Sequence, residues 1–124
     1  MYVFYNANFC GEYTGDCVIR AICKAECMDW HDVYDDLTIQ GRMMCAWGDT
    51  NKVWESYLED IGYSSRTIDH PFTRQYTIAD FAYDHPRGTY IVCTGTHVVC
   101  VQDGIIYDSW NSSGEIPIYY FYRR

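Results

Sequence analysis

A chain of 124 residues with 48% hydrophobic and 18% aromatic content is long enough to bury one core, and we expect a single domain over residues 1–124. The net charge of −8 repels phosphate backbones and anionic lipid surfaces, which argues against nucleic-acid and membrane partners. Because no stretch is apolar enough to span a bilayer and the first residues lack the order of a signal peptide, we expect a cytoplasmic protein.

The first two thirds of the chain show helical periodicity. A first helix is expected after Asp16, a plausible N-cap that follows the turn residue Gly15. Its apolar residues form one stripe made of Val18, Ile19, Ile22 and Ala25. Similar patterns predict three further helices, from Asp29 to about Gly41, from Thr50 to Ile61, and from Thr77 to Tyr83.

The last third of the chain is rich in β-branched and aromatic residues, which are typical of strands. Four runs predict strands at Thr89–Thr94, His97–Gln102, Ile105–Asp108 and Ile116–Tyr122. Helices therefore come first and strands second. This order indicates an α+β fold in which N-terminal helices pack on a C-terminal antiparallel β-sheet.

The dipeptide Asp103-Gly104 lies between two of these strands and suits the positive φ angles of a two-residue type I′ hairpin turn. Such a turn pairs Gln102 with Ile105, and counting outward brings His97 opposite Trp110. Alternation then puts His97, Val99, Asp108 and Trp110 on one face. An extra residue in the loop, or a bulge, would separate them.

His97 and Asp108 form a diagonal pair in this register, roughly 7–8 Å apart before the side chains reach toward each other. A carboxylate at this place would fix the imidazole tautomer and stabilise the imidazolium formed during catalysis. Asp108 as an ordinary turn carboxylate is the competing interpretation. Trp110, beside the pair, would exclude water from the hydrogen bond and help to orient it.

Cys17 is the candidate nucleophile. It alone of the seven cysteines follows a turn residue and a cap into the first turn of a helix, where the helix dipole and unpaired amides lower a thiol pKa. The same amides can receive an oxyanion, and an upstream polar side chain usually completes such a hole. Asn8 is our candidate for that donor, with Asn6 and Glu12 behind it.

The order of these residues resembles papain-like cysteine peptidases, in which an N-terminal helix bears the Cys and a later sheet bears the His and an Asn or Asp. Asp108-Ser109-Trp110 is similar to the Asn-Ser-Trp motif of papain-type enzymes, with Asp in place of Asn. The runs 15–17 and 97–101 resemble bacteriocin-processing double-glycine peptidase domains. The run 15–22 also resembles small papain-like proteins of bacterial and phage genomes.

The sequence departs from that family in three respects. The oxyanion Gln that such peptidases place shortly before the Cys is missing, since Gly11 and Glu12 stand there. The Cys-Gly-Ser-Cys-Trp signature is absent, and the chain is shorter than a two-lobed papain. These departures concern the substrate class more than the fold.

The remaining cysteines have a simpler interpretation. In a reducing compartment an odd number of cysteines usually stays as thiols, so we predict no disulfide bonds. Cys23 and Cys27 have the spacing of zinc ligands, but they fall in or at the end of a predicted helix and no second pair follows, so no metal or cofactor is expected. Arg20 is expected to pair with an acidic neighbour rather than with a substrate.

We therefore predict a thiol hydrolase that cleaves a peptide or isopeptide bond through a triad of Cys17, His97 and Asp108 and an acyl-enzyme intermediate. Its partner would be a protein or peptide substrate, in the host cytoplasm if the gene is phage-borne, and a monomer is the working expectation. Two alternatives stay open: acyl transfer on the same scaffold, and an inactive papain-like binding or inhibitory protein. The missing Gln favours the latter modestly.

Overall fold

A computed structural model describes residues 1–70 and 75–123. Within these residues the chain forms an α+β fold in which helices and strands follow one another in this order: β1 (Tyr2–Phe4), α1 (Cys17–Glu26), α2 (Trp30–Met43), α3 (Asn51–Asp60), β2 (Tyr63–Thr67), α4 (Ile78–Asp84), β3 (Thr89–Cys93), β4 (Val98–Gln102), β5 (Ile105–Asp108) and β6 (Tyr119–Arg123).

The six strands form one sheet with the order β1-β5-β4-β3-β6-β2. The prediction of a wholly antiparallel C-terminal sheet is wrong at its edges. β1, from the N-terminus, pairs in parallel with β5, and β2, between α3 and α4, pairs antiparallel with β6. Both strands were missed because β1 has only three residues and β2 buries only Tyr63. Their strand conformation comes from their partners rather than from their own apolar pattern.

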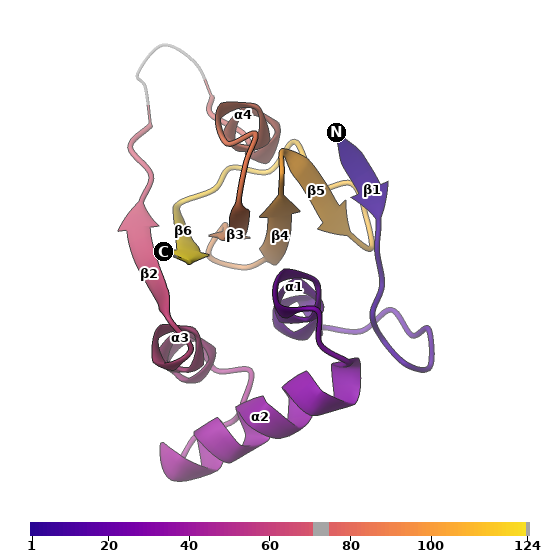
Figure 1. Ribbon diagram of the computed structural model, residues 1–124, viewed down its shortest axis with the longest axis vertical. Coiled ribbons are helices and arrows are strands. Elements are labelled where there is room, and N and C mark those ends of the chain that lie inside the picture. The colour runs from indigo at the N-terminus through magenta and orange to yellow at the C-terminus, as the bar shows by residue number, and fades with distance from the viewer. Residues whose placement is uncertain (71–74, 124) are drawn as a thin grey trace.

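Apolar side chains cover both faces of the sheet. On one face α1, α2 and α3 pack together over β3, β4 and β6, around a core that includes Ile22, Leu58 and Phe121. On the other face α4 contributes Ile78 and Phe81 to a smaller cluster. Figure 1 shows this division, with α1, α2 and α3 on one side of the strands and α4 on the opposite side. Alternation along β3 and β4 supplies both clusters.

The predicted helices agree with the structure to within a few residues, with two differences. Gly41 does not end α2, which continues to Met43, because the Gly41 carbonyl accepts a hydrogen bond from Ala46 N and stays inside the last turn. Asp16 is the N-cap residue of α1, but its side chain does not cap the helix. That carboxylate is buried and turned toward Arg20 instead.

The predicted hairpin register is confirmed. Asp103 and Gly104 have φ angles of 51° and 76°, and Gln102 pairs with Ile105. The ladder between β4 and β5 ends at Cys100–Tyr107, so the predicted pairing of His97 with Trp110 lies beyond it. β1 pairs along the other edge of β5, with Phe4 opposite Asp108. His97 therefore lies just before β4, and Asp108 lies at the last position of β5. In the part of the chain that the structure describes, no helix has both the length and the apolar character needed to cross a membrane.

Candidate active site

Cys17 is the first residue of α1, and its side chain is partly buried. The helix begins here because the Asp16 carbonyl accepts the first helical hydrogen bond, from Arg20 N at 2.9 Å. The amides of the first turn have no partner within the helix and direct partial positive charge toward the thiol. This is the environment in which a thiol ionises readily.

The structure brings His97 and Asp108 together. Their interaction joins Nε2 of His97 to Oδ2 of Asp108 at 2.6 Å, and the carboxylate is only 2% exposed. Because Nε2 is taken by the carboxylate, Nδ1 is the ring nitrogen left for the Cys17 thiol, and the thiol and the imidazole are close enough for each to shift the pKa of the other. Cys17 and His97 also line the same hollow, so the structure brings the three residues to one place.

The Asp108 carboxylate is held by polar groups that lie close to it in the sequence. Ser112 donates its hydroxyl to Oδ2 at 2.6 Å, and the backbone N–H of Ser109 donates to Oδ1 at 2.8 Å. Ser112 is fully buried. Trp110 packs against His97 with 4.8 Å between ring centroids, and the indole is itself half exposed. The segment after β5 therefore holds the Asp108 carboxylate in place and covers one side of the His97 ring.

Arg20 is a buried cation that connects the start of α1 to the carboxylate. One terminal nitrogen of its guanidinium forms an ion pair with Asp16. The other terminal nitrogen, Nη2, lies 3.4 Å from Oδ1 of Asp108. Asp16 also accepts hydrogen bonds from the Trp30 indole at 2.9 Å and from the Asn8 amide at 3.2 Å. The expectation that Arg20 pairs with an acidic neighbour is confirmed. Its contact with Asp108 has no local sequence signal, since 88 residues separate the two.

The electrostatics of the triad favour an ionised pair. Burial raises the pKa of the Cys17 thiol, but hydrogen bonds from His97 and from the Val98 backbone, with the nearby positive charges, outweigh it and hold that pKa below its usual range. Burial lowers the pKa of His97, yet its hydrogen bonds with Asp108 and Cys17 raise it to about 9. Both shifts favour a thiolate beside an imidazolium over the neutral pair.

The Asp108 carboxyl stays ionised in this environment. Burial raises its pKa, but hydrogen bonds from His97 and Ser112 and the charge of His97 bring the pKa below its ordinary value. An ionised acid is what keeps the imidazolium stable. The three shifts have one common cause, which is the hydrogen-bonded chain itself.

A hollow of about 140 Å³ opens beside Cys17 and His97. Its lining also includes Gly15, Gly95, Thr96, Trp54, Cys93 and Tyr119. Asn51, the first residue of α3, also lines it, and its side-chain carbonyl accepts a hydrogen bond from the Trp54 indole at 3.0 Å. Because that bond uses only the carbonyl oxygen, the N–H₂ group of the Asn51 amide keeps its capacity to donate. Sequence reasoning missed Asn51, although its place at the start of a helix was visible.

The structure does not bring Asn8 to this hollow. The Asn8 amide donates to Asp16, and its carbonyl oxygen accepts from the backbone N–H groups of Cys10 and Glu12. Asn6 braces the same loop, since its amide donates to the Glu12 carbonyl. Asn8 therefore supports the loop before α1 and the carboxylate that holds Arg20.

The other cysteines lack this environment. Cys23, Cys93 and Cys100 are buried, and burial raises the pKa of each above the ordinary thiol value. All seven cysteines are free thiols in the structure. Among the described residues no group of three or more His, Cys, Asp or Glu side chains is arranged to hold a metal ion.

Comparison of the chain with family models, with curated proteins and with solved structures returned no match.

Proposed function

We propose that this protein is a papain-like thiol hydrolase that cleaves a peptide or isopeptide bond. The observation that carries the proposal is the contact of 2.6 Å between His97 Nε2 and Asp108 Oδ2, with Cys17 and His97 lining the same hollow. A nucleophile, a base and a group that orients the base are the parts that covalent acyl transfer requires.

In the first half of the reaction the Cys17 thiolate attacks the carbonyl carbon of the substrate amide. A carbon–sulfur bond forms, and the carbonyl electrons move to the oxygen. The His97 imidazolium then gives its proton to the amide nitrogen as the carbon–nitrogen bond breaks. The amine leaves, and a thioester and a neutral imidazole remain.

In the second half His97 takes a proton from water, and the resulting hydroxide attacks the thioester carbon. The carbon–sulfur bond breaks, the acid product leaves, and Cys17 returns as thiolate beside an imidazolium. Asp108 keeps its negative charge throughout and holds His97 in the tautomer that points Nδ1 at sulfur.

Two groups beside the thiol can stabilise the oxyanion. One is the backbone N–H of Cys17, which is unpartnered in the first turn of α1. The other is the side-chain amide of Asn51, a residue that lines the same hollow. Removing one such donor typically lowers the rate about 10²–10³-fold.

The proposal is tested by labelling the native protein with iodoacetamide near neutral pH and following each thiol by mass spectrometry. Cys17 should alkylate faster than the other six, and His97→Gln should slow it toward the rate of an ordinary thiol. Cys10, Cys27 and Cys45 are internal controls, because they are more exposed than Cys17 and access alone would favour them.

A peptide library digested with the native protein and with Cys17→Ala completes the test. Cleavage that depends on Cys17 supports hydrolysis, and products extended by an added amine would indicate acyl transfer instead. Equal and slow labelling of all seven thiols would contradict the proposal.

A further inference from the structure

Arg20 is buried one turn after Cys17 on α1 and takes no part in the proton transfers of the proposed reaction. Residues three apart on a helix are neighbours, with about 5–6 Å between their Cβ atoms, and helical side chains lean toward the N-terminus. The Arg20 guanidinium therefore lies at the start of the helix, near the thiol. Its side chain is only 7% exposed, so solvent screens its charge weakly.

The guanidinium links the segment before α1 to the acid of the triad. Nη1 pairs with the Asp16 carboxylate and lies 3.4 Å from the Thr14 carbonyl oxygen, while Nη2 lies 3.4 Å from Oδ1 of Asp108. Oδ2 of the Asp108 carboxylate is the atom that contacts His97. Arg20 thus lies against the carboxylate oxygen that does not contact the imidazole.

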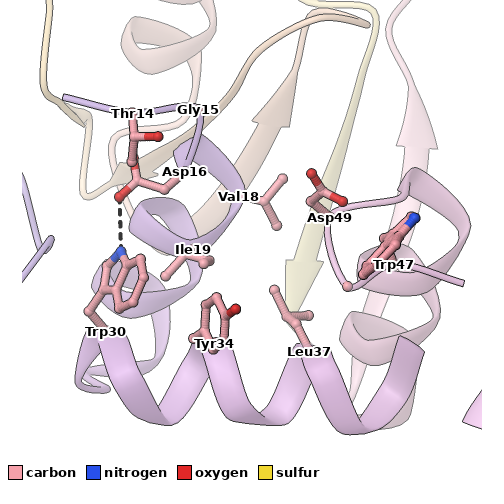
Figure 2. A pocket seen from close by; sticks show the side chains of 11 residues that line it. Thr14, Gly15, Asp16, Val18, Ile19, Trp30, Tyr34, Leu37, Trp47 and Asp49 are labelled. Carbon is pink, nitrogen blue, oxygen red and sulfur yellow. Dashed lines mark hydrogen bonds between the residues drawn. The ribbon is translucent and has the colours of Figure 1, made fainter. Parts of the chain in front are cut away.

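Asp16 is itself held in place, which allows it to orient Arg20. The Trp30 indole donates to Oδ2 of Asp16 at 2.9 Å, and the Asn8 amide donates to the same oxygen at 3.2 Å. Figure 2 shows the bond from Trp30 beside a cavity of about 360 Å³ that residues of α1 and α2 line. Because Oδ2 has two donors, Oδ1 is the oxygen that faces Arg20.

Stability alone does not account for a buried arginine at this place. Nε of Arg20 is buried without a hydrogen-bond partner among the described residues, and an unpaired buried donor destabilises a fold. A buried ion pair is also often no more stable than apolar side chains of the same volume. A buried charge with an unpaired donor therefore indicates a need for the charge itself, as at functional sites.

The charges around Cys17 show what that need is. Titratable or charged groups near the thiol come from several elements: Asp16 and Arg20 at the start of α1, Asp49 before α3, Cys93 of β3, His97 before β4, Asp108 of β5 and Tyr119 of β6. Arg20 and His97 are the cations of this set. Without Arg20 the Asp16 and Asp108 carboxylates would face the thiol uncompensated, and negative charge disfavours a thiolate. The Arg20 charge accordingly lowers the pKa of Cys17.

From these contacts we propose, resting on the function proposed above, that Arg20 is a positioning residue of the reaction. Its guanidinium fixes the Asp108 carboxylate in the orientation that His97 needs, and its charge offsets the carboxylates beside the Cys17 thiolate. Asp16 orients Arg20 in turn. Charge and orientation are separate contributions, so different variants remove them.

The charge is tested by iodoacetamide modification of Cys17 across pH. In Arg20→Gln the midpoint of the rate profile should move to higher pH, and the rate below the midpoint should fall by about tenfold, the effect of a one-unit rise in pKa. Arg20→Lys keeps the charge and should follow the native profile. The double variant Arg20→Gln/Asp16→Asn restores the local charge and should recover most of the lost rate. Arg20→Gln/Asp35→Asn changes an exposed carboxylate on α2 instead and should not.

Proton NMR tests the orientation. In the native protein the His97 N–H proton bound to Asp108 should exchange slowly with water, and its absence from the His97→Gln spectrum assigns it. Arg20→Lys places a point charge where the guanidinium has a planar fork, so it should hold only one of the two carboxylates. The proton should therefore exchange faster in Arg20→Lys and in Arg20→Gln, because Oδ1 of Asp108 has lost the guanidinium.

Arg123→Gln is the matched control for the loss of one positive charge. Arg123 forms an ion pair with Glu26 at 2.9 Å, between the ends of β6 and α1, and its removal should leave the rate profile and the proton exchange unchanged. A native rate profile in Arg20→Gln would overturn the proposal. If Arg20→Gln does not fold, native proton exchange in Arg20→Lys would overturn it.

Neither measurement requires peptide cleavage, so this proposal and the proposed function fail separately. If the Arg20 variants behave as expected but the native protein cleaves no peptide, the hydrolase proposal fails while Arg20 still orients Asp108 and ionises the thiol. If the native protein cleaves peptides through Cys17 but the Arg20 variants keep the native profile and exchange, only the inference about Arg20 fails.

Discussion

Asp108 is the residue at which the supports of the candidate site meet. Its carboxylate accepts from His97, Ser112 and Ser109, and Arg20 lies against Oδ1. Its backbone carbonyl accepts from Tyr5 N at 2.7 Å. A group with this many partners has one orientation, so the direction of the imidazole is set before any substrate arrives.

Replacing Asp108 by Asn should change the pH dependence of Cys17. Without the carboxylate the pKa of His97 falls from about 9 toward its ordinary value, and the Cys17 pKa rises because its neighbour is then neutral. Each unit of that rise cuts the thiolate fraction about tenfold at pH values below the pKa. Rates of iodoacetamide modification across pH measure the shift. Asp35→Asn is the control, and superimposable profiles for Asp108→Asn and the native protein would contradict the prediction.

Arg20 should be coupled energetically to Asp16. Arg20→Gln leaves buried carboxylates without their cation, a change that typically costs about 3–5 kcal/mol. In the double variant with Asp16→Asn one of those carboxylates is also gone, so the loss in free energy of unfolding should be smaller than the sum of the single losses by about 0.5–3 kcal/mol. Urea unfolding of the four proteins gives the coupling. Additive losses would show that the contact contributes nothing.

At the scale of elements, the β4–β5 hairpin decides whether the site forms. Its turn has positive φ at both Asp103 and Gly104, so neither a slipped register nor a longer loop is favoured. This is why the partnership of His97 and Asp108 could be predicted from sequence: the turn dipeptide and the twofold alternation of strands are local signals. The start of α1 at Cys17 was predictable from other local signals, which are the turn residue Gly15 before Asp16 and the apolar stripe that follows.

Gly104→Ala should destabilise the fold while Asp103→Asn should not. Ala in the left-handed region costs about 1–2 kcal/mol, and its Cβ would also lie 3.3 Å from the Ala82 carbonyl. Asn tolerates the conformation that Asp103 adopts. Thermal unfolding measures both. Gly114→Ala is the matched control, since nothing lies within 4 Å of a Cβ there, and an equal loss in Gly114→Ala and Gly104→Ala would refute the argument.

Other features had no local signal to be predicted from. β2 reads Tyr-Ser-Ser-Arg-Thr, which has no apolar alternation, and it is a strand only because it pairs with β6. The Asp16 side chain was expected to cap α1, but its carboxylate instead pairs with the buried Arg20 and accepts a hydrogen bond from the Trp30 indole. Asn8 is close to Cys17 in sequence, whereas Asn51, which lines the hollow, comes from another helix. Tertiary contacts decide each of these cases.

At the scale of the whole molecule, burial of thiols and tyrosines on the α1 face makes the fold sensitive to alkali. Burial raises the pKa of Tyr5, Cys23 and Cys100 to about 12, and burial with carboxylate neighbours raises the pKa of Tyr57 and Tyr63 above its usual range. A raised folded-state pKa gives stability that is complete below the unfolded pKa and is lost as pH rises through the folded one. The stability that His97 contributes is lost first, as pH rises from the ordinary pKa of histidine to its folded-state pKa of about 9.

The free energy of unfolding, and with it the melting temperature, should therefore fall as pH rises above the ordinary pKa of histidine. The slope of the free energy is near 1.4 kcal/mol per pH unit for each group that ionises only on unfolding. Cys17, whose pKa is lowered, acts in the opposite direction but is a single group. Calorimetry across this pH range measures the slope. Cys100→Ala should reduce it and Cys10→Ser, at an exposed position, should not. A melting temperature that stays constant to about pH 11 would contradict the assignment of these groups as buried.

The distance along the chain between Cys17 and its partners determines when, during synthesis, the thiol can first meet the imidazole. During synthesis Cys17 leaves the ribosome long before His97 and Asp108 exist, and β1 has to wait for β5 before it can pair. Throughout that interval the thiol lacks the imidazole that ionises it. Under the proposed function, the nascent chain therefore carries Cys17 without an activating base until the β4–β5 hairpin is complete.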